Sequence, residues 1–139
     1  KLNNSDKYIW VFNTHFDNAG SIARMESARL IIKKIEEISK LRNCDLVFMG
    51  DLNSEPDSDP VKYLSQNLME TRSNCLTKPY GNSATWNGFD FQKKSERQID
   101  FIFAGKSNKL LITKFITIDD FYDFKYPSDH FPIMVTLSY

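Results

Sequence analysis

The sequence predicts an α/β domain, because short apolar runs typical of strands alternate with segments of helical periodicity. Residues 8–12 and 46–49 are continuous apolar or aromatic runs, and an amphipathic segment opened by Ser21 lies between them. A second helical segment follows at residues 61–67, so the order is strand, helix, strand, helix. Three further strand-like runs complete the chain, at residues 98–103, 110–118 and 133–137.

The amino-acid composition limits the class of protein to which the chain can belong. The 139 residues are enough for one domain or part of one, and 41% hydrophobic with 26% charged residues is globular rather than disordered composition. Lys plus Arg equals Asp plus Glu at 18 each, so we do not expect a broad basic face for duplex nucleic acid, although a local patch stays open. Cys44 and Cys75 lack metal-ligand spacing and are either bridged or free thiols. No apolar run approaches membrane-spanning length, so we expect no membrane insertion.

The first strand-like run, Tyr8–Phe12, consists of β-branched and aromatic residues, which predicts a strand buried on both faces. It leads into Asn13, Thr14 and His15, a polar group at the end of the strand. A histidine there is either a structural residue or, where it meets carboxylates, a catalytic one.

The helical segment opened by Ser21 has apolar residues at helical spacing and is expected to pack on a sheet. Arg24 and Arg29 lie close to its start. Each arginine either reaches a phosphate group or is solvated and paired on the surface. The apolar positions are Ala28, Ile31, Ile32, Ile35 and Ile38.

The second apolar run enters Gly50-Asp51-Leu52-Asn53. Side chains alternate along an extended chain, so Asp51 and Asn53 project the same way at the carboxyl end of a strand. Binding and catalytic residues of α/β proteins are concentrated at the carboxyl ends of strands. The pair either forms a turn or orients a water molecule and holds a phosphoryl oxygen beside a cation.

Residues 72–98 are the least regular part of the chain and exceed the usual loop length. Before them, Pro60 suits the first position of the short helix at residues 61–67. Within the loop, Trp86 and Phe89 form an aromatic cluster that either stacks on a base, lines a substrate groove or packs internally.

Asp100 lies inside an apolar run, where a carboxylate is costly unless it is paired or hydrogen-bonded. The best candidate partner is His130, which with Asp129 comes shortly before the closing strand. Between them, residues 110–118 alternate as a half-exposed strand does, and residues 119–124 form an acidic, aromatic segment expected at the surface.

Taken in order, these polar groups resemble the endonuclease/exonuclease/phosphatase family, which includes DNase I, abasic-site endonucleases, sphingomyelinases, inositol polyphosphate phosphatases and poly(A)-specific deadenylases. The resemblance runs from about Tyr8 to the end of the chain. It rests on Asn13-Thr14-His15, the Ala23–Arg29 segment, Gly50–Ser54, Thr85-Trp86, Gln98–Phe103 and Ser128–Pro132.

The resemblance implies a DNase I-like four-layer α/β/β/α sandwich in a domain about twice as long as this chain. Residues 1–139 resemble the C-terminal part of one such domain, with one mixed sheet and its covering helices. The N-terminal half of the family's domain supplies an Asn and a metal-binding Glu, and nothing before Tyr8 matches them. We therefore expect an N-terminal half of the same domain as a partner, and an exposed apolar sheet face in its absence.

The resemblance also implies roles for individual residues. His130, held by Asp100, stabilises or protonates phosphate oxygens, Asp51 orients or deprotonates the attacking water, and Asn53 donates to a phosphoryl oxygen. Asp129 helps to hold Mg²⁺ or Mn²⁺, which prefer carboxylate and water oxygens. His15 corresponds to a histidine near the leaving group, and the residues expected to bind substrate are Arg24, Trp86 and Phe89.

The implied function is a divalent-metal-dependent phosphoesterase that cleaves a phosphodiester or phosphomonoester by in-line attack of water. The alternatives are a non-catalytic fragment or binding module of the same fold and, more narrowly, a nuclease acting on single-stranded nucleic acid. The substrate is a phosphate ester, and nucleic acid, sugar phosphate, nucleotide and lipid headgroup all stay open. The cellular compartment also stays open.

Overall fold

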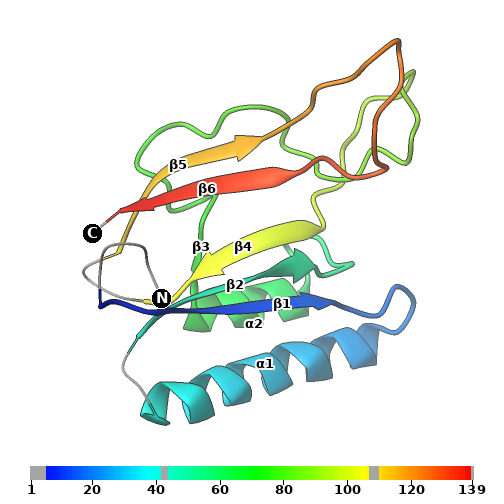
Figure 1. Ribbon diagram of the computed structural model, residues 1–139. Coiled ribbons are helices and arrows are strands. Elements are labelled where there is room, and N and C mark those ends of the chain that lie inside the picture. The colour runs from blue at the N-terminus through cyan, green and yellow to red at the C-terminus, as the bar shows by residue number, and fades with distance from the viewer. Residues whose placement is uncertain (1–5, 42–43, 107–109, 139) are drawn as a thin grey trace.

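The computed structural model describes residues 6–41, 44–106 and 110–138 (Figure 1). These residues form two helices and six strands in an alternating α/β order that agrees with the prediction. The elements are β1 (Ile9–His15), α1 (Ser21–Leu41), β2 (Asp45–Asp51), α2 (Asp59–Asn67), β3 (Met69–Glu70), β4 (Asp100–Ala104), β5 (Leu111–Thr117) and β6 (Ile133–Ser138).

Four of the strands form a mixed sheet in the order β1-β2-β4-β3, in which β1 and β2 are parallel and β4 is antiparallel to both β2 and β3. Strands β5 and β6 pair with each other as an antiparallel ladder that lies beyond β4 (Figure 1). The mixed sheet with covering helices is confirmed. The two-residue strand β3 has no counterpart in the sequence prediction, because two residues are too few to show a period.

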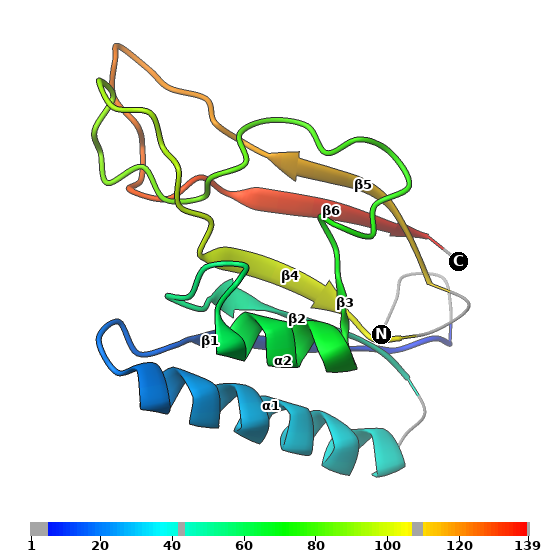
Figure 2. The ribbon, with the colours of Figure 1, turned by 180° about the vertical axis from the view of Figure 1, so that it is seen from behind.

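Both helices pack on one face of the four-stranded sheet, as Figures 1 and 2 show from opposite sides. Phe48 of β2 forms the centre of the core, and its ring stacks at 5.8 Å from that of Phe103, which in turn lies 5.9 Å from Phe101. Each helix is half exposed, and within the described part of the chain neither has the length and apolarity needed to cross a bilayer. The buried helical residues are Ala28, Ile32 and Ile35 of α1 and Pro60, Val61 and Leu64 of α2.

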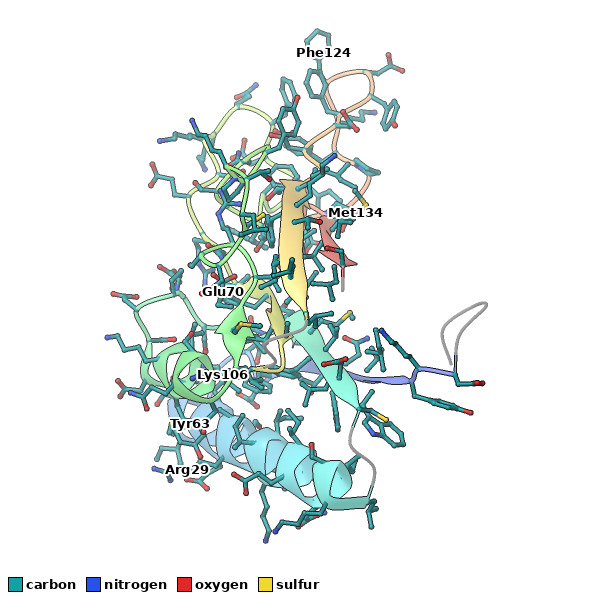
Figure 3. The ribbon with its side chains drawn as sticks, turned by 90° about the vertical axis from the view of Figure 1, so that its left-hand side faces the viewer. Arg29, Tyr63, Glu70, Lys106, Phe124 and Met134 are labelled. Atoms are coloured by element: carbon teal, nitrogen blue, oxygen red, sulfur yellow. The ribbon has the colours of Figure 1, made fainter. Side chains whose placement is uncertain are left out.

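The predicted burial of the first strand on both faces is wrong. Strand β1 lies at the edge of the sheet, and Trp10 is 38% and Val11 60% exposed. Met134 of β6 is 45% exposed, and Figure 3 shows it on the side of the molecule away from the helices. Met134 therefore contributes exposed apolar surface on that side, which agrees with the expectation of an exposed apolar sheet face.

The topology brings polar strand ends together at one edge of the sheet. His15 ends β1 and is paired in register with Asp51, which ends β2. Asp51 is paired with Asp100, which begins the antiparallel strand β4, so the three residues form one cross-strand row. They lie three positions from the core residues Phe12, Phe48 and Phe103, and side chains alternate, so the row projects from the face opposite the helices.

Gly50 allows the ends of β1 and β2 to approach each other. Its φ is +148°, and a Cβ atom built on it would overlap the carbonyl oxygen of Thr14 on the neighbouring strand. The register that sets His15 beside Asp51 therefore depends on the missing side chain.

Substituting Gly50→Ala should lower the free energy of unfolding by about 1–3 kcal/mol or more, because backbone atoms of a paired strand must move to admit the methyl group. Urea denaturation followed by circular dichroism measures the change. Gly20→Ala is the matched control, since its added Cβ meets only side-chain atoms at 3.1 and 3.2 Å. Equal stability of the two variants would contradict this account of Gly50.

Candidate active site

Five of the predicted catalytic side chains come together at this edge of the sheet. His15, Asp51 and Asp100 come from the ends of β1 and β2 and the start of β4, Asn53 follows β2, and His130 precedes β6. Hydrogen bonds or close polar contacts link all five in one connected group. The predicted grouping of these residues therefore agrees with the geometry, and their roles stay predictions.

Asp100 and His130 form the innermost pair of the group. His130 Nδ1 lies 2.8 Å from Asp100 Oδ2, and both side chains are largely covered, at 27% and 18% exposure. A carboxylate oxygen only accepts, so the imidazole carries its proton on Nδ1 and directs Nε2 away from Asp100. This pairing supplies the partner that the embedded Asp100 was predicted to need.

Asp51 lies between the two imidazole rings. Its Oδ2 is 3.3 Å from His15 Nε2 and 3.8 Å from His130 Nε2, while its Oδ1 accepts a hydrogen bond of 2.7 Å from the Asn53 backbone amide. The amide fixes the carboxylate plane, and Oδ2 faces the space between the rings. A carboxylate oxygen held in this way can accept a proton from a water molecule in that space.

Asn53 holds the loop after β2 against the end of β1. Its Nδ2 donates to the Phe16 carbonyl oxygen at 3.0 Å and lies 2.9 Å from His15 Nε2. Because the Phe16 carbonyl requires a donor, this amide orientation makes His15 Nε2 an acceptor. The His15 side chain is 69% exposed, so a phosphoryl oxygen can replace it as the partner of one Asn53 N–H.

Burial raises the pKa of Asp100 from the ordinary value of an aspartate. Hydrogen bonds from the side chains of Thr85 and His130 act in the opposite direction and only partly offset this effect. The folded protein therefore bears a cost for the charged carboxylate, which His130 and Thr85 reduce.

Asp51, Asp100 and His130 form a group with the donor set of a divalent cation site, since one ligand atom from each lies within 4.8 Å of the others. Two carboxylates beside an imidazole suit Mn²⁺, and carboxylates with substrate oxygens suit Mg²⁺. Asp100 and His130 already bond each other, so Asp51 offers the available oxygen. Asp129 lies outside this group, and its role as a metal ligand stays a prediction.

Two buried polar residues of the long loop support the site and were not singled out as site residues from the sequence. Thr85 Oγ1 accepts hydrogen bonds of 3.0 Å from the backbone amides of Ile99 and Asp100 and so fixes the start of β4. Asn87 donates from its backbone to the Asp129 carbonyl oxygen at 2.8 Å and from Nδ2 to the Ser128 carbonyl oxygen at 3.1 Å. Their position on either side of Trp86 is the signal that could have identified them.

The predicted substrate-binding aromatic residues lie beside this support. Trp86 forms an isolated bridge with His130 and is 36% exposed, but the Arg97 guanidinium lies 5.3 Å from the centre of its ring. Phe89 is 62% exposed, with a φ of +59°. A cation covers one face of the indole, so stacking on a ligand is limited to the remaining surface, and the substrate-binding roles of Trp86 and Phe89 stay predictions.

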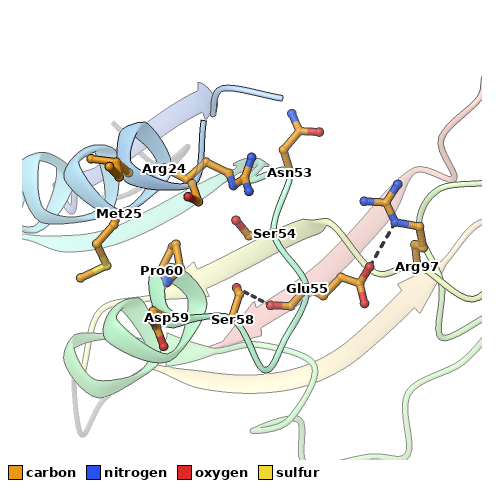
Figure 4. Close-up of a pocket in the computed structure, with 11 residues that line it drawn as sticks. Arg24, Met25, Asn53, Ser54, Glu55, Ser58, Asp59, Pro60 and Arg97 are labelled. Atoms are coloured by element: carbon orange, nitrogen blue, oxygen red, sulfur yellow. Dashed lines mark hydrogen bonds and ion pairs between the residues drawn. The ribbon is translucent and has the colours of Figure 1, made fainter. Parts of the chain in front are cut away.

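Arg24, the third predicted substrate-binding residue, lines a cavity of about 530 Å³ next to Asn53 (Figure 4). Its Nη1 donates to the Asp17 carbonyl oxygen at 3.2 Å. Ser54, which also lines the cavity, is 5% exposed, and its hydroxyl has no hydrogen-bond partner among the described residues. A buried hydroxyl without a partner costs about 1–3 kcal/mol.

Comparison with known families shows that residues 3–130 match the model of the Endonuclease/Exonuclease/phosphatase family. Among solved structures, a mannosyl-6-phosphatase of Bacteroides thetaiotaomicron is 30% identical with a TM-score of 0.86, over 93% of this chain and 51% of that one. An endonuclease/exonuclease/phosphatase of Bacteroides vulgatus is 28% identical with a TM-score of 0.76, over 89% and 47%.

A functionally unknown conserved protein of Enterococcus faecalis shares the fold, with a TM-score of 0.87 at 21% identity, over 99% of this chain and 53% of that one. The chain thus spans about half the length of the solved structures that it matches. A search of curated protein sequences found no match. The DNase I-like fold class predicted from the sequence is confirmed.

Asp100→Asn should gain stability relative to the wild type as the pH rises. Burial raises the pKa of Asp100, so the wild-type contribution is fully present below the unfolded pKa of about 3.9 and is lost as the pH rises through the folded pKa. Urea unfolding near pH 3.5 and pH 7, with EDTA present to exclude metal, measures the difference.

Asp17→Asn is the control of opposite sign. Backbone hydrogen bonds from Gly20 and Ala19 lower the pKa of Asp17, so its contribution is present above the unfolded pKa and is lost as the pH falls. That variant should therefore lose stability relative to the wild type as the pH rises. The same trend in both variants would contradict the assigned environment of Asp100.

Proposed function

Because the chain belongs to the endonuclease/exonuclease/phosphatase family, we propose that it supplies catalytic side chains of a divalent-metal-dependent phosphoesterase. Members of this family are hydrolases that act on phosphoesters and generally depend on a divalent metal. The observation that supports the proposal most strongly is the position of Asp51 between two imidazoles, one of which Asp100 holds.

Hydrolysis of a phosphate ester requires neutralisation of negative charge, an oriented water molecule and stabilisation of the leaving oxygen. Asp51 Oδ2 accepts a proton from the attacking water or orients it. The Nε2 atom of His130 faces the same space and, when protonated, donates to a phosphoryl oxygen. Asp100 favours this imidazolium, because its carboxylate lies 2.8 Å from Nδ1.

Asn53 and His15 complete the proposed assignment. Asn53 exchanges its contact with His15 for a phosphoryl oxygen, and the exposed His15 imidazole is then available to the leaving group. Asp129, with substrate oxygens, would help to hold a divalent cation, Mg²⁺ or Mn²⁺, which would supply Lewis-acid neutralisation of the phosphoryl charge.

The identity of the ester is a separate part of the proposal. The 30% identical solved structure is that of a mannosyl-6-phosphatase, which supports a phosphomonoester as the substrate here. Formal neutrality of the chain, with 18 cationic and 18 acidic side chains, favours a small ester over an extended polyanion.

His130→Ala and Asp51→Asn should each lower Mg²⁺-dependent hydrolysis by the intact protein by about 10²–10⁴-fold, because each removes a proton-transfer or charge-stabilising group. Initial rates with phenyl phosphate and a matching diester measure the loss. Glu26→Gln is the control, since this residue pairs with Arg29 on the exposed side of α1. Retained turnover in either site variant would refute the roles given to His130 and Asp51.

Removal of metal with EDTA should abolish hydrolysis, and Mg²⁺ or Mn²⁺ should restore it. Asp129→Asn should raise the metal concentration needed for half-maximal rate if Asp129 is a ligand. The rate as a function of added metal measures both effects. Hydrolysis that persists in EDTA would exclude the metal-dependent mechanism, and ester binding without hydrolysis in saturating metal would favour the alternative of a binding module.

A further inference from the structure

A cavity of about 530 Å³ adjoins the candidate active site through Asn53. Its walls come from the start of α1, the loop after β2, the start of α2 and Arg97 from the segment before β4 (Figure 4). The volume lies within the range of small-molecule sites, about 300–1,000 Å³. Asn53 therefore has one side in the catalytic group and the other in a space large enough for the remainder of a small substrate.

The charges that line the cavity are balanced. Two guanidinium groups, Arg24 and Arg97, and two carboxylates, Glu55 and Asp59, are among the residues that line it. Arg97 Nε lies 3.1 Å from Glu55 Oε1, so this pair is already formed without a ligand (Figure 4). A second phosphate group would gain attraction from the arginines and lose it to the carboxylates.

The uncharged lining suits hydroxyl groups and a saturated ring. Ser54 contributes a buried hydroxyl without a partner among the described residues, and Figure 4 shows it turned toward Arg24 and Pro60. Ile22, Met25 and Pro60 supply apolar surface. None of the described residues lining the cavity is aromatic, so a nucleobase would find no ring on which to stack.

We propose that this cavity binds the leaving group of the substrate and that this group is a polyhydroxylated ring, a sugar or a cyclitol. The paired Glu55 and Arg97 side chains bind adjacent hydroxyls as acceptor and donor, and the apolar wall packs on the C–H face of the ring. The inference rests on the proposed phosphoesterase function. In the reaction, a water oxygen bonds to phosphorus, the bond from phosphorus to the ring's ester oxygen breaks, and the alcohol leaves with a proton.

The test compares kcat/KM of the intact protein for hexose 6-phosphate and for cyclohexylmethyl phosphate, which is also a primary alkyl ester of a saturated six-membered ring but has no hydroxyls. The hexose ester should be preferred by at least about tenfold, because a site built to bind hydroxyls rejects an analogue that lacks them. Glu55→Gln should remove most of this preference.

Glu26→Gln is the matched control for Glu55→Gln. Both changes convert a carboxylate to an amide in an exposed pair with arginine, Glu55 at 51% and Glu26 at 60% exposure, and Glu26 lies outside the cavity. The control should keep the wild-type preference for the hexose ester. Loss of the preference in both variants would show that the effect does not come from the cavity.

Other outcomes overturn the inference and leave the proposed function intact. Equal kcat/KM for the two esters would mean that the cavity does not recognise hydroxyl groups of the substrate. A preference for hexose 1,6-bisphosphate over hexose 6-phosphate would make it an anion site. A preference for a short oligonucleotide that depends on Trp86 would shift leaving-group binding to the aromatic side of the site.

Failure of the proposed function itself is distinguishable. If no ester is hydrolysed in Mg²⁺ or Mn²⁺, the catalytic proposal fails, and calorimetry then tests the cavity directly. Hexose 6-phosphate should still bind about tenfold more tightly than cyclohexylmethyl phosphate and lose this advantage in Glu55→Gln. Equal affinity of the two esters would overturn the inference.

Discussion

The hydrogen bond between Asp100 and His130 joins the four-stranded sheet to the two-stranded ladder and fixes the orientation of the His130 imidazole in the candidate site. Asp100 begins β4 of the four-stranded sheet, and His130 precedes β6 of the two-stranded ladder, so the bond at 2.8 Å connects the two. Each group needs the other. Burial raises the pKa of the Asp100 carboxyl and so disfavours its charged form, and the His130 imidazole requires an acceptor to fix its tautomer. Burying the Asp100 carboxylate thus lowers the stability of the folded protein, while its hydrogen bond to Nδ1 directs His130 Nε2 toward Asp51.

The site follows from strand direction as much as from residue chemistry. Parallel strands β1 and β2 end at the same edge, and antiparallel β4 begins there, which places His15, Asp51 and Asp100 in one cross-strand row. The row lies on the face opposite the helices, away from the aromatic core around Phe48. The candidate site residues and the core therefore occupy opposite faces of the same three strands. Gly50 allows this arrangement because it lets the ends of β1 and β2 approach each other.

The sequence allowed much of this to be predicted, because strands and helices with clear periods have local signals and because Asp100 in an apolar run required a partner. It could not reveal that β1 is an edge strand, since an apolar run looks the same at an edge and in the centre of a sheet. Nor could it reveal that Thr85 supports the start of β4, because that depends on how an irregular loop folds across the sheet. The relation between Asn53 and Arg24 is likewise tertiary, as the lining of one cavity brings them together.

In the proposed function, the strand ends and the helix starts recognise different parts of the substrate. The strand ends present acids and imidazoles to the phosphoryl group, whose chemistry is common to every phosphate ester, whereas the helix starts line a cavity of balanced charge. A site that selected its substrate by charge alone would leave its guanidiniums unpaired, but Arg97 is paired with Glu55. Discrimination at such a cavity must come from the geometry of hydrogen bonds, because electrostatic attraction is largely cancelled there. Asn53 belongs both to the candidate catalytic group and to the cavity lining, so in this proposal it would relate the position of the leaving group to that of the phosphoryl oxygen.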